Sequence, residues 1–336
     1  MNDLEFNFSE IINMIEERRK NAYKKVNEEL ISLYWDFGKY ISEKVNDSNW
    51  GDKIVDKLVE FMKREYPAMR GFNRAGIYRM KQFYETYKDN KIVAPLVRQI
   101  SWTHNVMILG ATNSIEEKEF YIKMCIKNNY SKRELDRQIS SGYFHRYMLS
   151  DGKANQSLSK TVGEEDYPNT KLLDTYSLEF LDLPNQYSEK DLKKAIISNM
   201  KDFILEIGND FTYVGEEYRV QVGNEDFYID LLFYNRTLSC LVAFELKIGK
   251  FKPEYISKMD FYLEALDRQE KKKNENPSVG VILCASKDVQ VVEYAMSRSM
   301  SPTMVSQYTL KLIDKKLLEE KLKEINDIVE ENNNKE

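Results

Sequence analysis

The stretch FYIDLLFYNRTLSCLVAFELKIGK (Phe227–Lys250) contains two apolar runs joined by the short polar segment NRTL. Each run has apolar residues on both faces of an extended chain, as strands in the middle of a sheet do, and the joining segment is short enough for a hairpin. Asp230, Glu245 and Lys247 lie inside these runs. An ionised side chain in such a place is costly unless it meets an opposite charge. The charges therefore need an explanation.

Pairing of the two strands predicts a site that carries chemistry. Side chains alternate between the faces of a strand, so Glu245 and Lys247 point the same way, and the hairpin brings Asp230 near Glu245. Two neighbouring carboxylates repel each other unless they share a positive partner, and a divalent metal ion meets that need. Hard oxygen ligands favour Mg²⁺ or Mn²⁺. The competing interpretation is an edge strand whose charges face water, with Glu245 and Lys247 as an exposed ion pair.

The residues after Ser188 show alternating helix and strand patterns. A helix is predicted from the Ser188 cap to Gly208. Apolar runs typical of strands, and two amphipathic helices, then follow in the order strand, strand, strand, helix, strand, helix, strand, and this order is typical of an α/β domain. The runs are FTYVGEEYRVQV, FYIDLLFYN, SCLVAFELK, PEYISKMDFYLEALDRQEKKK, SVGVILCAS, VQVVEYAMSRS and MVSQYTLKLI.

The first half of the chain has the periodicity of helices. From Phe8 to about Tyr147, apolar residues recur at spacings of three and four. Asn73 is placed as a helix N-cap. Ser114 and Ser131 are each followed three residues later by a glutamate, which predicts two capping boxes.

These patterns divide the chain into four parts. Residues 1–148 are expected to form an all-helical domain, and the polar residues of 149–187 a linker. Residues 188–320 are expected to form the α/β domain, and residues 321–336 a charged tail.

The segment FYIDLLFYNRTLSCLVAFELKIGKFKPEYISKMDFYLEALDRQ resembles the core of the PD-(D/E)xK nuclease superfamily, in particular its YhcG-like family. Asp230 matches the Asp of that motif, and Glu245-Leu246-Lys247 matches its (D/E)xK part. The first half resembles the N-terminal domain of the same family in GFNRAGIYRMKQFYETY, LVRQISWTHNVMIL and EKEFYIKMCIKNNYSKRELDRQI. The resemblance implies an α+β two-domain protein. Its all-α N-terminal domain would precede an α/β restriction-endonuclease-like domain, with a central mixed sheet flanked by helices.

The resemblance also implies Mg²⁺-dependent hydrolysis of phosphodiester bonds, with Mn²⁺ as a substitute. Asp230 and Glu245 would hold the metal, with the carbonyl of Leu246 as a further ligand. Glu206, at the end of the predicted helix, matches the acidic residue that many members supply from their first helix. Lys247 would orient or deprotonate the attacking water, or stabilise charge on the phosphate. Ile229 stands where the motif usually has Pro.

Several basic residues are expected to contact nucleic acid. Lys258 matches the position in the following helix where many superfamily members have Gln or Lys, and Lys250 and Lys252 flank the predicted site. In the helical half, Arg74, Arg79 and Lys81 follow a turn at Gly71, in a segment rich in basic residues, as in a helix-turn-helix reader of DNA. The alternative is a set of ordinary charged positions on amphipathic helices.

Overall composition excludes some classes of protein. No apolar run is long enough to span a membrane, and the N-terminus lacks the pattern of a secretory signal, so a cytoplasmic protein without membrane contact is expected. The three cysteines and two histidines have no zinc-ligand spacing. The net charge of -5 neither indicates nor excludes nucleic-acid binding, which needs only a local basic face.

The function expected from the sequence is a metal-dependent nuclease acting on DNA, an endonuclease rather than an exonuclease. Its helical domain would recognise nucleic acid or a partner. An RNA nuclease with the same site, and a non-catalytic protein that binds DNA or assembles with partners, are the alternatives. A homodimer is also considered, because cutting both strands of a duplex needs two sites.

Overall fold

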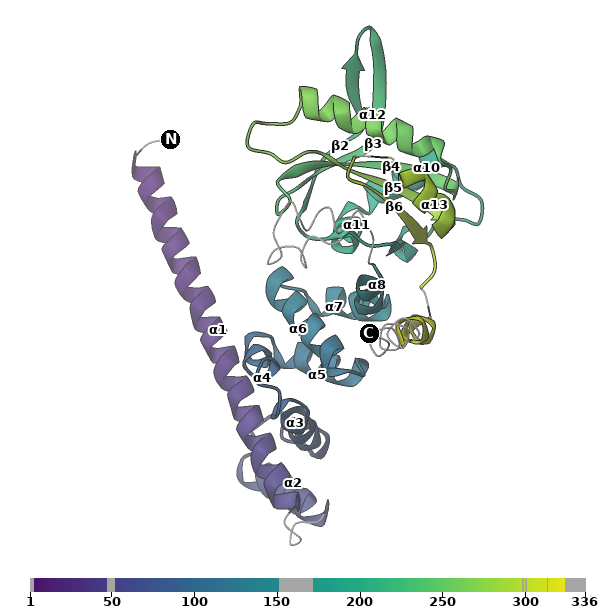
Figure 1. Ribbon diagram of the computed structural model, residues 1–336. Helices are drawn as coiled ribbons and strands as arrows, with labels where there is room; N and C mark the ends of the chain where they lie inside the picture. Colours follow the sequence, from purple (N-terminus) through teal and green to yellow (C-terminus); the bar gives the residue numbers. More distant parts are fainter. Residues whose placement is uncertain are drawn as a thin grey trace, which may run out of the picture. The chain divides into compact units, whose positions relative to one another are not determined.

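Helices make up the first unit of the chain, and a mixed sheet with helices makes up the second (Figure 1). The computed structural model describes residues 3–46, 52–150, 172–297, 299, 301–312 and 314–323. The two units are Met1–Ile139 and Ser140–Glu336. No helix in the part of the chain that the structure describes is both long enough and apolar enough to cross a membrane.

The first unit confirms the predicted all-helical half. Its elements are α1 (Asp3–Asn46), α2 (Asp52–Glu65), α3 (Arg74–Tyr87), α4 (Val93–Leu96), the 3₁₀ turn η1 (Val97–Gln99), α5 (Trp102–Ala111), α6 (Ile115–Asn128) and α7 (Lys132–Ser140).

Side-chain caps begin the helices where the sequence predicts them. Asn73 accepts a hydrogen bond from the backbone N–H of Gly76 at 2.8 Å, and α3 begins at the next residue. Ser114 accepts from the N–H of Glu117 at 3.1 Å. Ser131 and Glu134 each accept from the other's backbone N–H, which is the reciprocal pair of a capping box.

The second half of α1 packs closely against α3. Ile41 of α1 and Ile77 of α3 share a buried cluster with Val55 and Val59 of α2. The two backbones come so near at Gly38 that a Cβ atom there would lie 2.1 Å from the carbonyl oxygen of Met80. A glycine at this position therefore allows the contact on which the core of the first unit is built.

The second unit is a six-stranded mixed sheet with helices, as the resemblance implies. Its strands lie in the order β1-β6-β5-β4-β3-β2; β2, β3 and β4 are antiparallel neighbours, and β4, β5, β6 and β1 are parallel neighbours. The elements are α8 (Tyr143–Leu149), β1 (Thr175–Ser177), the 3₁₀ turn η3 (Glu179–Leu181), α10 (Glu189–Ser198), α11 (Met200–Ile207), β2 (Phe211–Val222), β3 (Glu225–Asn235), β4 (Cys240–Lys250), α12 (Glu254–Gln269), β5 (Val279–Ser286), α13 (Val289–Met296) and β6 (Thr303–Thr309).

Helices α12 and α11 cover opposite faces of the sheet at β4 (Figure 1). Ala243 shares a buried cluster with Met259 and Leu263 of α12. Phe244, the next residue, contacts the ring of Phe203 of α11, with ring centroids 5.9 Å apart. The strand is thus covered on both faces, which explains why its sequence is apolar at nearly every position.

Two elements differ from the sequence expectation. Thr175–Ser177, within the expected linker 149–187, forms β1 and pairs with β6, so this part of the segment belongs to the sheet. Three residues are too few to show the alternation of a strand. The helix predicted from Ser188 to Gly208 is broken at Asn199 into α10 and α11. Residues 151–171 and 324–336, in the expected linker and tail, lie outside the described residues.

Gly38→Ala should destabilise the first unit by about 3 kcal/mol, because the new Cβ would overlap the backbone of Met80. All three tryptophans lie in this unit, so tryptophan fluorescence during urea unfolding reports on it alone. The matched control is Gly110→Ala. Gly110 is exposed in α5 with open space around it, and the substitution should stabilise the unit by about 0.5–1 kcal/mol. Equal effects of the two substitutions would contradict the close contact.

Candidate active site

The hairpin of β3 and β4 brings Asp230 level with Glu245. Asn235 pairs with Cys240 next to the turn, and the pairing continues along the strands to Leu231 and Phe244. Asp230 and Glu245 are the next residues on the two strands. At this level the side chain of Asp230 accepts a hydrogen bond, at 2.9 Å, from the backbone N–H of Leu246. A carboxylate thus takes a backbone donor of the neighbouring strand, and this charge-assisted bond fixes its orientation.

Glu245 is the buried acid at the centre of the candidate site, and it is 1% exposed. Its Oε1 atom faces two ammonium groups, Lys247 Nζ at 2.9 Å and Lys258 Nζ at 2.5 Å. Its Oε2 atom is also buried, and no described residue donates a hydrogen bond to it. A buried carboxylate needs compensation, and here the lysines supply it at one oxygen only.

Lys247 links the sheet to α10. Its ammonium also donates to Glu189 at 3.1 Å and lies 5.5 Å from the centre of the Tyr255 ring. Burial by itself would lower the pKa of Lys247, but the hydrogen bonds and negative charges of Glu245 and Glu189 raise it above its usual value. Lys247 is therefore a cation at neutral pH.

Lys258, which the resemblance placed near the site, lies beside Glu245. It comes from the first turns of α12, and its ammonium lies 5.2 Å from the centre of the Tyr262 ring. Burial would lower the pKa of Lys258, but Glu245 raises it above the usual value. Lys258 therefore compensates the charge of Glu245 in the structure described.

Lys193 of α10 pairs with the other carboxylate of the site, Asp230. Its ammonium donates to Asp230 at 3.0 Å and also to Glu217. On β2, Glu216 pairs with Leu231 and Tyr218 pairs with Ile229, so Glu217 lies opposite Asp230. The backbone of Glu217 is in the left-handed region, with a φ of 44°. A non-glycine residue in this conformation is strained, and such strain is frequent at functional sites.

The sequence interpretation missed Lys193, Glu189 and Glu217. Glu189 and Lys193 are four residues apart on a predicted helix and so share one face of it. That spacing is common on solvated helices, and only the packing of α10 shows which face meets the strands.

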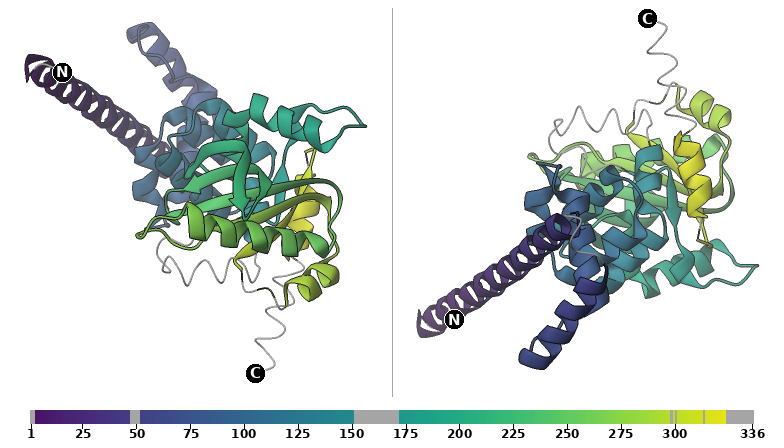
Figure 2. Two further views of the ribbon diagram at one scale, coloured as in Figure 1. Left: turned by 90° about the horizontal axis from the view of Figure 1, so that it is seen from above. Right: turned by 90° about the horizontal axis from the view of Figure 1, so that it is seen from below.

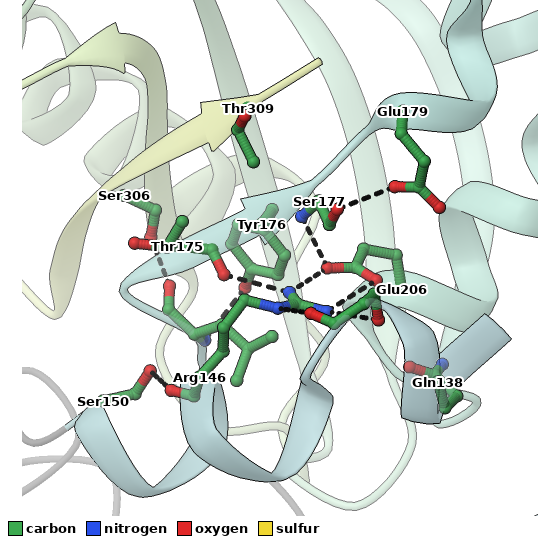
Figure 3. A network of polar contacts seen from close by, with 12 residues as sticks. Gln138, Arg146, Ser150, Thr175, Tyr176, Ser177, Glu179, Glu206, Ser306 and Thr309 are labelled. Carbon is green, nitrogen blue, oxygen red and sulfur yellow. Dashed lines mark hydrogen bonds and ion pairs between the residues drawn. The ribbon is translucent and has the colours of Figure 1, made fainter. Parts of the chain in front are cut away.

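Glu206, which the resemblance expects at the metal, belongs to a buried network of polar contacts with Arg146 and Ser177 (Figure 3). It is fully buried, with both oxygens bound by the guanidinium of Arg146, and Oε1 also accepts from the N–H of Ser177 at 2.7 Å. Among the described residues, no group of three or more His, Cys, Asp or Glu side chains could hold a metal ion. The helix break at Asn199 places Glu206 on α11, whereas Lys193, which contacts Asp230, lies on α10.

Three further predicted site residues lie near the end of β4: Leu246 and Lys250 within the strand, and Lys252 two residues after it. Leu246 is buried, and its N–H orients Asp230. Lys250 and Lys252 have mostly exposed side chains, each about 3.9 Å from an acidic partner, Asp288 and Glu254 respectively. These distant surface pairs hold the two lysines weakly, so both ammonium groups stay accessible to a ligand.

The basic residues predicted in the helical unit differ in how accessible they are. Arg74 pairs with Asp56 at 3.0 Å and Arg79 is exposed on α3. Lys81 is bound by Glu85, which also accepts a hydrogen bond from Ser42. The connection from α2 to α3 spans residues 66–73 and is longer than the three or four residues of a helix-turn-helix turn. The geometry therefore supports Arg74 and Arg79 as surface cations, without that motif.

The Asp230–Glu245 pair fits a divalent cation. Both side chains offer hard oxygen donors from neighbouring strands, and the buried Oε2 atom of Glu245 has no hydrogen bond from any described residue. Mg²⁺ needs no third carboxylate, because it is commonly bound by one or two carboxylates together with water and substrate phosphates.

A mixed sheet that carries Asp on one strand and Glu-x-Lys on the next, with helices on both faces, defines the PD-(D/E)xK class of nuclease folds. The protein-family model of the YhcG PDDEXK nuclease domain matches residues 169–323. The DUF1016 N-terminal domain matches residues 10–146. The chain belongs to the YhcG-like family of PD-(D/E)xK nucleases.

A relative in Escherichia coli (strain K12) is similar over nearly the whole chain. It carries the name "Putative nuclease YhcG", is 27% identical, and the match covers 96% of this chain and 94% of the relative.

Two solved structures are similar to part of the chain. One is the crystal structure of a repair endonuclease from Pyrococcus abyssi, at 15% identity and a TM-score of 0.26. The other is the structure of the EndoMS-dsDNA2 complex, at 16% identity and a TM-score of 0.26. The matches cover 39% and 38% of this chain, and 50% and 45% of those two chains, so the chain spans about half the length of each or less.

Glu206→Gln should destabilise the second unit by about 3–5 kcal/mol, because it leaves the buried guanidinium of Arg146 without its counter-charge. Hydrogen exchange of β4 and β5 peptides in urea would measure the loss. The control is Asp226→Asn, which removes an exposed pair with Arg219 and should cost less than about 1 kcal/mol. Unchanged stability with lost nuclease activity in Glu206→Gln would return Glu206 to the active site.

Proposed function

We propose that this protein is a Mg²⁺-dependent endonuclease that hydrolyses phosphodiester bonds in DNA, with Mn²⁺ as a substitute for Mg²⁺. The observation that carries the proposal is the pairing of Asp230 with the buried Glu245 on neighbouring strands, with Lys247 on the side of Glu245. A buried carboxylate oxygen without a hydrogen bond costs free energy of folding, and a ligand bound at that oxygen is the simplest explanation for it.

Asp230 and Glu245 would hold the metal, and the carbonyl of Leu246 is the further ligand proposed. When bound, a divalent cation lowers the pKa of a coordinated water and offsets charge on the phosphate. The chain itself orients the donors: the N–H of Leu246 holds one oxygen of Asp230. Glu206 has no part in this set.

Lys247 supplies a positive charge beside Glu245, one of the two proposed metal ligands. Because Glu245 and Glu189 hold it as an ammonium, stabilisation of negative charge on the phosphate is the role that its geometry supports. Action as a base would require a lower pKa, and hence loss of the Glu245 contact. Lys258, which contacts the same oxygen of Glu245 as Lys247 does, is proposed to contact the phosphate backbone together with Lys250 and Lys252.

The helical unit is proposed to recognise nucleic acid or a partner. Arg74 and Arg79 are the exposed cations of α3 that would meet a phosphate backbone, and Lys81 contributes less because Glu85 neutralises it. We place the activity in the cytoplasm, in keeping with three cysteines that are all free and buried.

Purified protein should cleave plasmid DNA with Mg²⁺ and not with EDTA, and Lys247→Ala should lower the rate about 10²- to 10³-fold, because one charge that stabilises the transition state is lost. Lys273→Ala is the matched control, since Lys273 is exposed beyond the far end of α12. Single-stranded DNA and RNA are run beside the plasmid.

The competing functions give different results in the same assay. Equal cleavage by wild type and Lys247→Ala would overturn the assigned site. Cleavage of RNA alone would overturn the substrate. Salt-sensitive DNA binding that survives Lys247→Ala, without cleavage of any substrate, would identify a non-catalytic DNA-binding protein.

Lys258→Met should tighten Mg²⁺ or Mn²⁺ binding about fivefold, because an ammonium 2.5 Å from Glu245 opposes a second cation there. The estimate takes about 1 kcal/mol for a partly exposed pair. Isothermal titration calorimetry at pH 7.5 measures it. Asp230→Asn should weaken binding, and Lys252→Met, which removes an exposed lysine, should leave it unchanged. Weaker binding in Lys258→Met would argue against a metal at Glu245.

A further inference from the structure

The first half of α1 exposes an apolar surface that its own unit does not cover. This part of the helix extends beyond the other helices of the first unit (Figure 2). Every side chain from residue 10 to residue 26 is exposed, and so is Phe8. The large apolar ones among them are Phe8, Ile11, Ile12, Met14, Ile15, Tyr23 and Val26, each 46% to 76% exposed.

A helix of this kind requires packing to be stable. Residues 8–26 span about 28 Å at 1.5 Å per residue. Most of the stability of protein helices comes from burial of an apolar face, and an unpacked helix of this length is marginal in water. The exposed apolar residues therefore indicate a partner surface.

One stripe along this surface is symmetric about its centre. Six positions recur at alternating steps of four and three residues, namely Phe8, Ile12, Ile15, Arg19, Ala22 and Val26. The steps are the same in both directions from Glu17, so Phe8 is as far from the centre as Val26, and Ile12 as far as Ala22. Alternating steps of three and four are the seam of a two-helix coiled coil. A symmetric seam fits a copy of itself that runs in the opposite direction.

The charges on the same helix have a matching asymmetry. Residues 8–17 carry three acidic and no basic residues, and residues 18–26 carry five basic and no acidic residues. In an antiparallel pair, the acidic half of each helix lies along the basic half of the other. Arg19, the one charged residue of the seam, comes level with Ile15 of the second copy and one residue from its Glu16. A parallel pair would instead place like charges side by side.

We propose that the first half of α1, residues 8–26, pairs with the same segment of a second copy of this chain in an antiparallel two-helix coiled coil centred near Glu17. The protein is then a homodimer joined through its helical unit. The pairing rests on residues of α1 alone and is independent of the nuclease proposal. A dimer of this kind holds two nuclease units in one particle.

The 336-residue chain at about 10 µM should have twice the mass of one chain by size exclusion with light scattering. Ile12→Glu/Ile15→Glu should be monomeric, because it places four carboxylates in the seam of each pair. The matched control, Asn13→Glu/Asn21→Glu, adds the same charge off the stripe and should remain a dimer. Tryptophan fluorescence during urea unfolding checks that the first unit stays folded in each variant. A monomeric wild type, or a dimer that survives Ile12→Glu/Ile15→Glu, would overturn the proposal.

Cysteine cross-linking tests the direction of the helices. Phe8 and Val26 are 18 residues apart, about 27 Å along one helix, too far for a disulfide within a chain. The double variant Phe8→Cys/Val26→Cys should oxidise to a covalent dimer, whereas either single variant should not. The native thiols give little background, because all three are buried and burial raises the pKa of Cys284 to about 11. Cross-linked dimers of both single variants would show a parallel pair and overturn the antiparallel one.

Discussion

The second unit depends on how the carboxylate of Glu245 is accommodated inside the sheet. An ionised group with 1% exposure cannot persist there without opposite charge, and Lys247 from its own strand and Lys258 from α12 provide it. Both cations lie at Oε1, and Oε2 is buried without a hydrogen bond from any described residue. The helix α12 thus completes the electrostatics of the site as well as covering one face of the sheet.

A second buried acid in the same unit shows the opposite arrangement. Arg146 binds both oxygens of Glu206, and the backbone of Ser177 adds a further donor, so its capacity to accept is used by the protein itself. Glu206 thus joins α8, β1 and α11 through these hydrogen bonds. Both glutamates are buried on regular elements, but of the two only Glu245 has a buried oxygen without a hydrogen bond from a described residue.

The first unit follows another constraint, the close contact of α1 with α3 at Gly38. That contact uses only the second half of α1. The first half continues as a helix with an apolar stripe and with its charges separated along its length. The second half of α1 therefore packs in the core of its unit, and the first half presents a surface suited to a second copy of the chain.

The sequence by itself determined the local elements and the central pair. Caps at Asn73, Ser114 and Ser131 depend on side-chain and backbone groups a few residues apart, and the hairpin that brings Asp230 level with Glu245 follows from a short turn between two strands. Only the tertiary structure decided the rest. The break at Asn199 divides the predicted helix into α10 and α11. The packing of α10 and α12 brings Lys193, Glu189 and Lys258 to the site, and it depends on contacts between residues distant in the sequence. Periodicity shows which face of a helix is apolar, but the sheet against which that face packs determines which polar residues meet there.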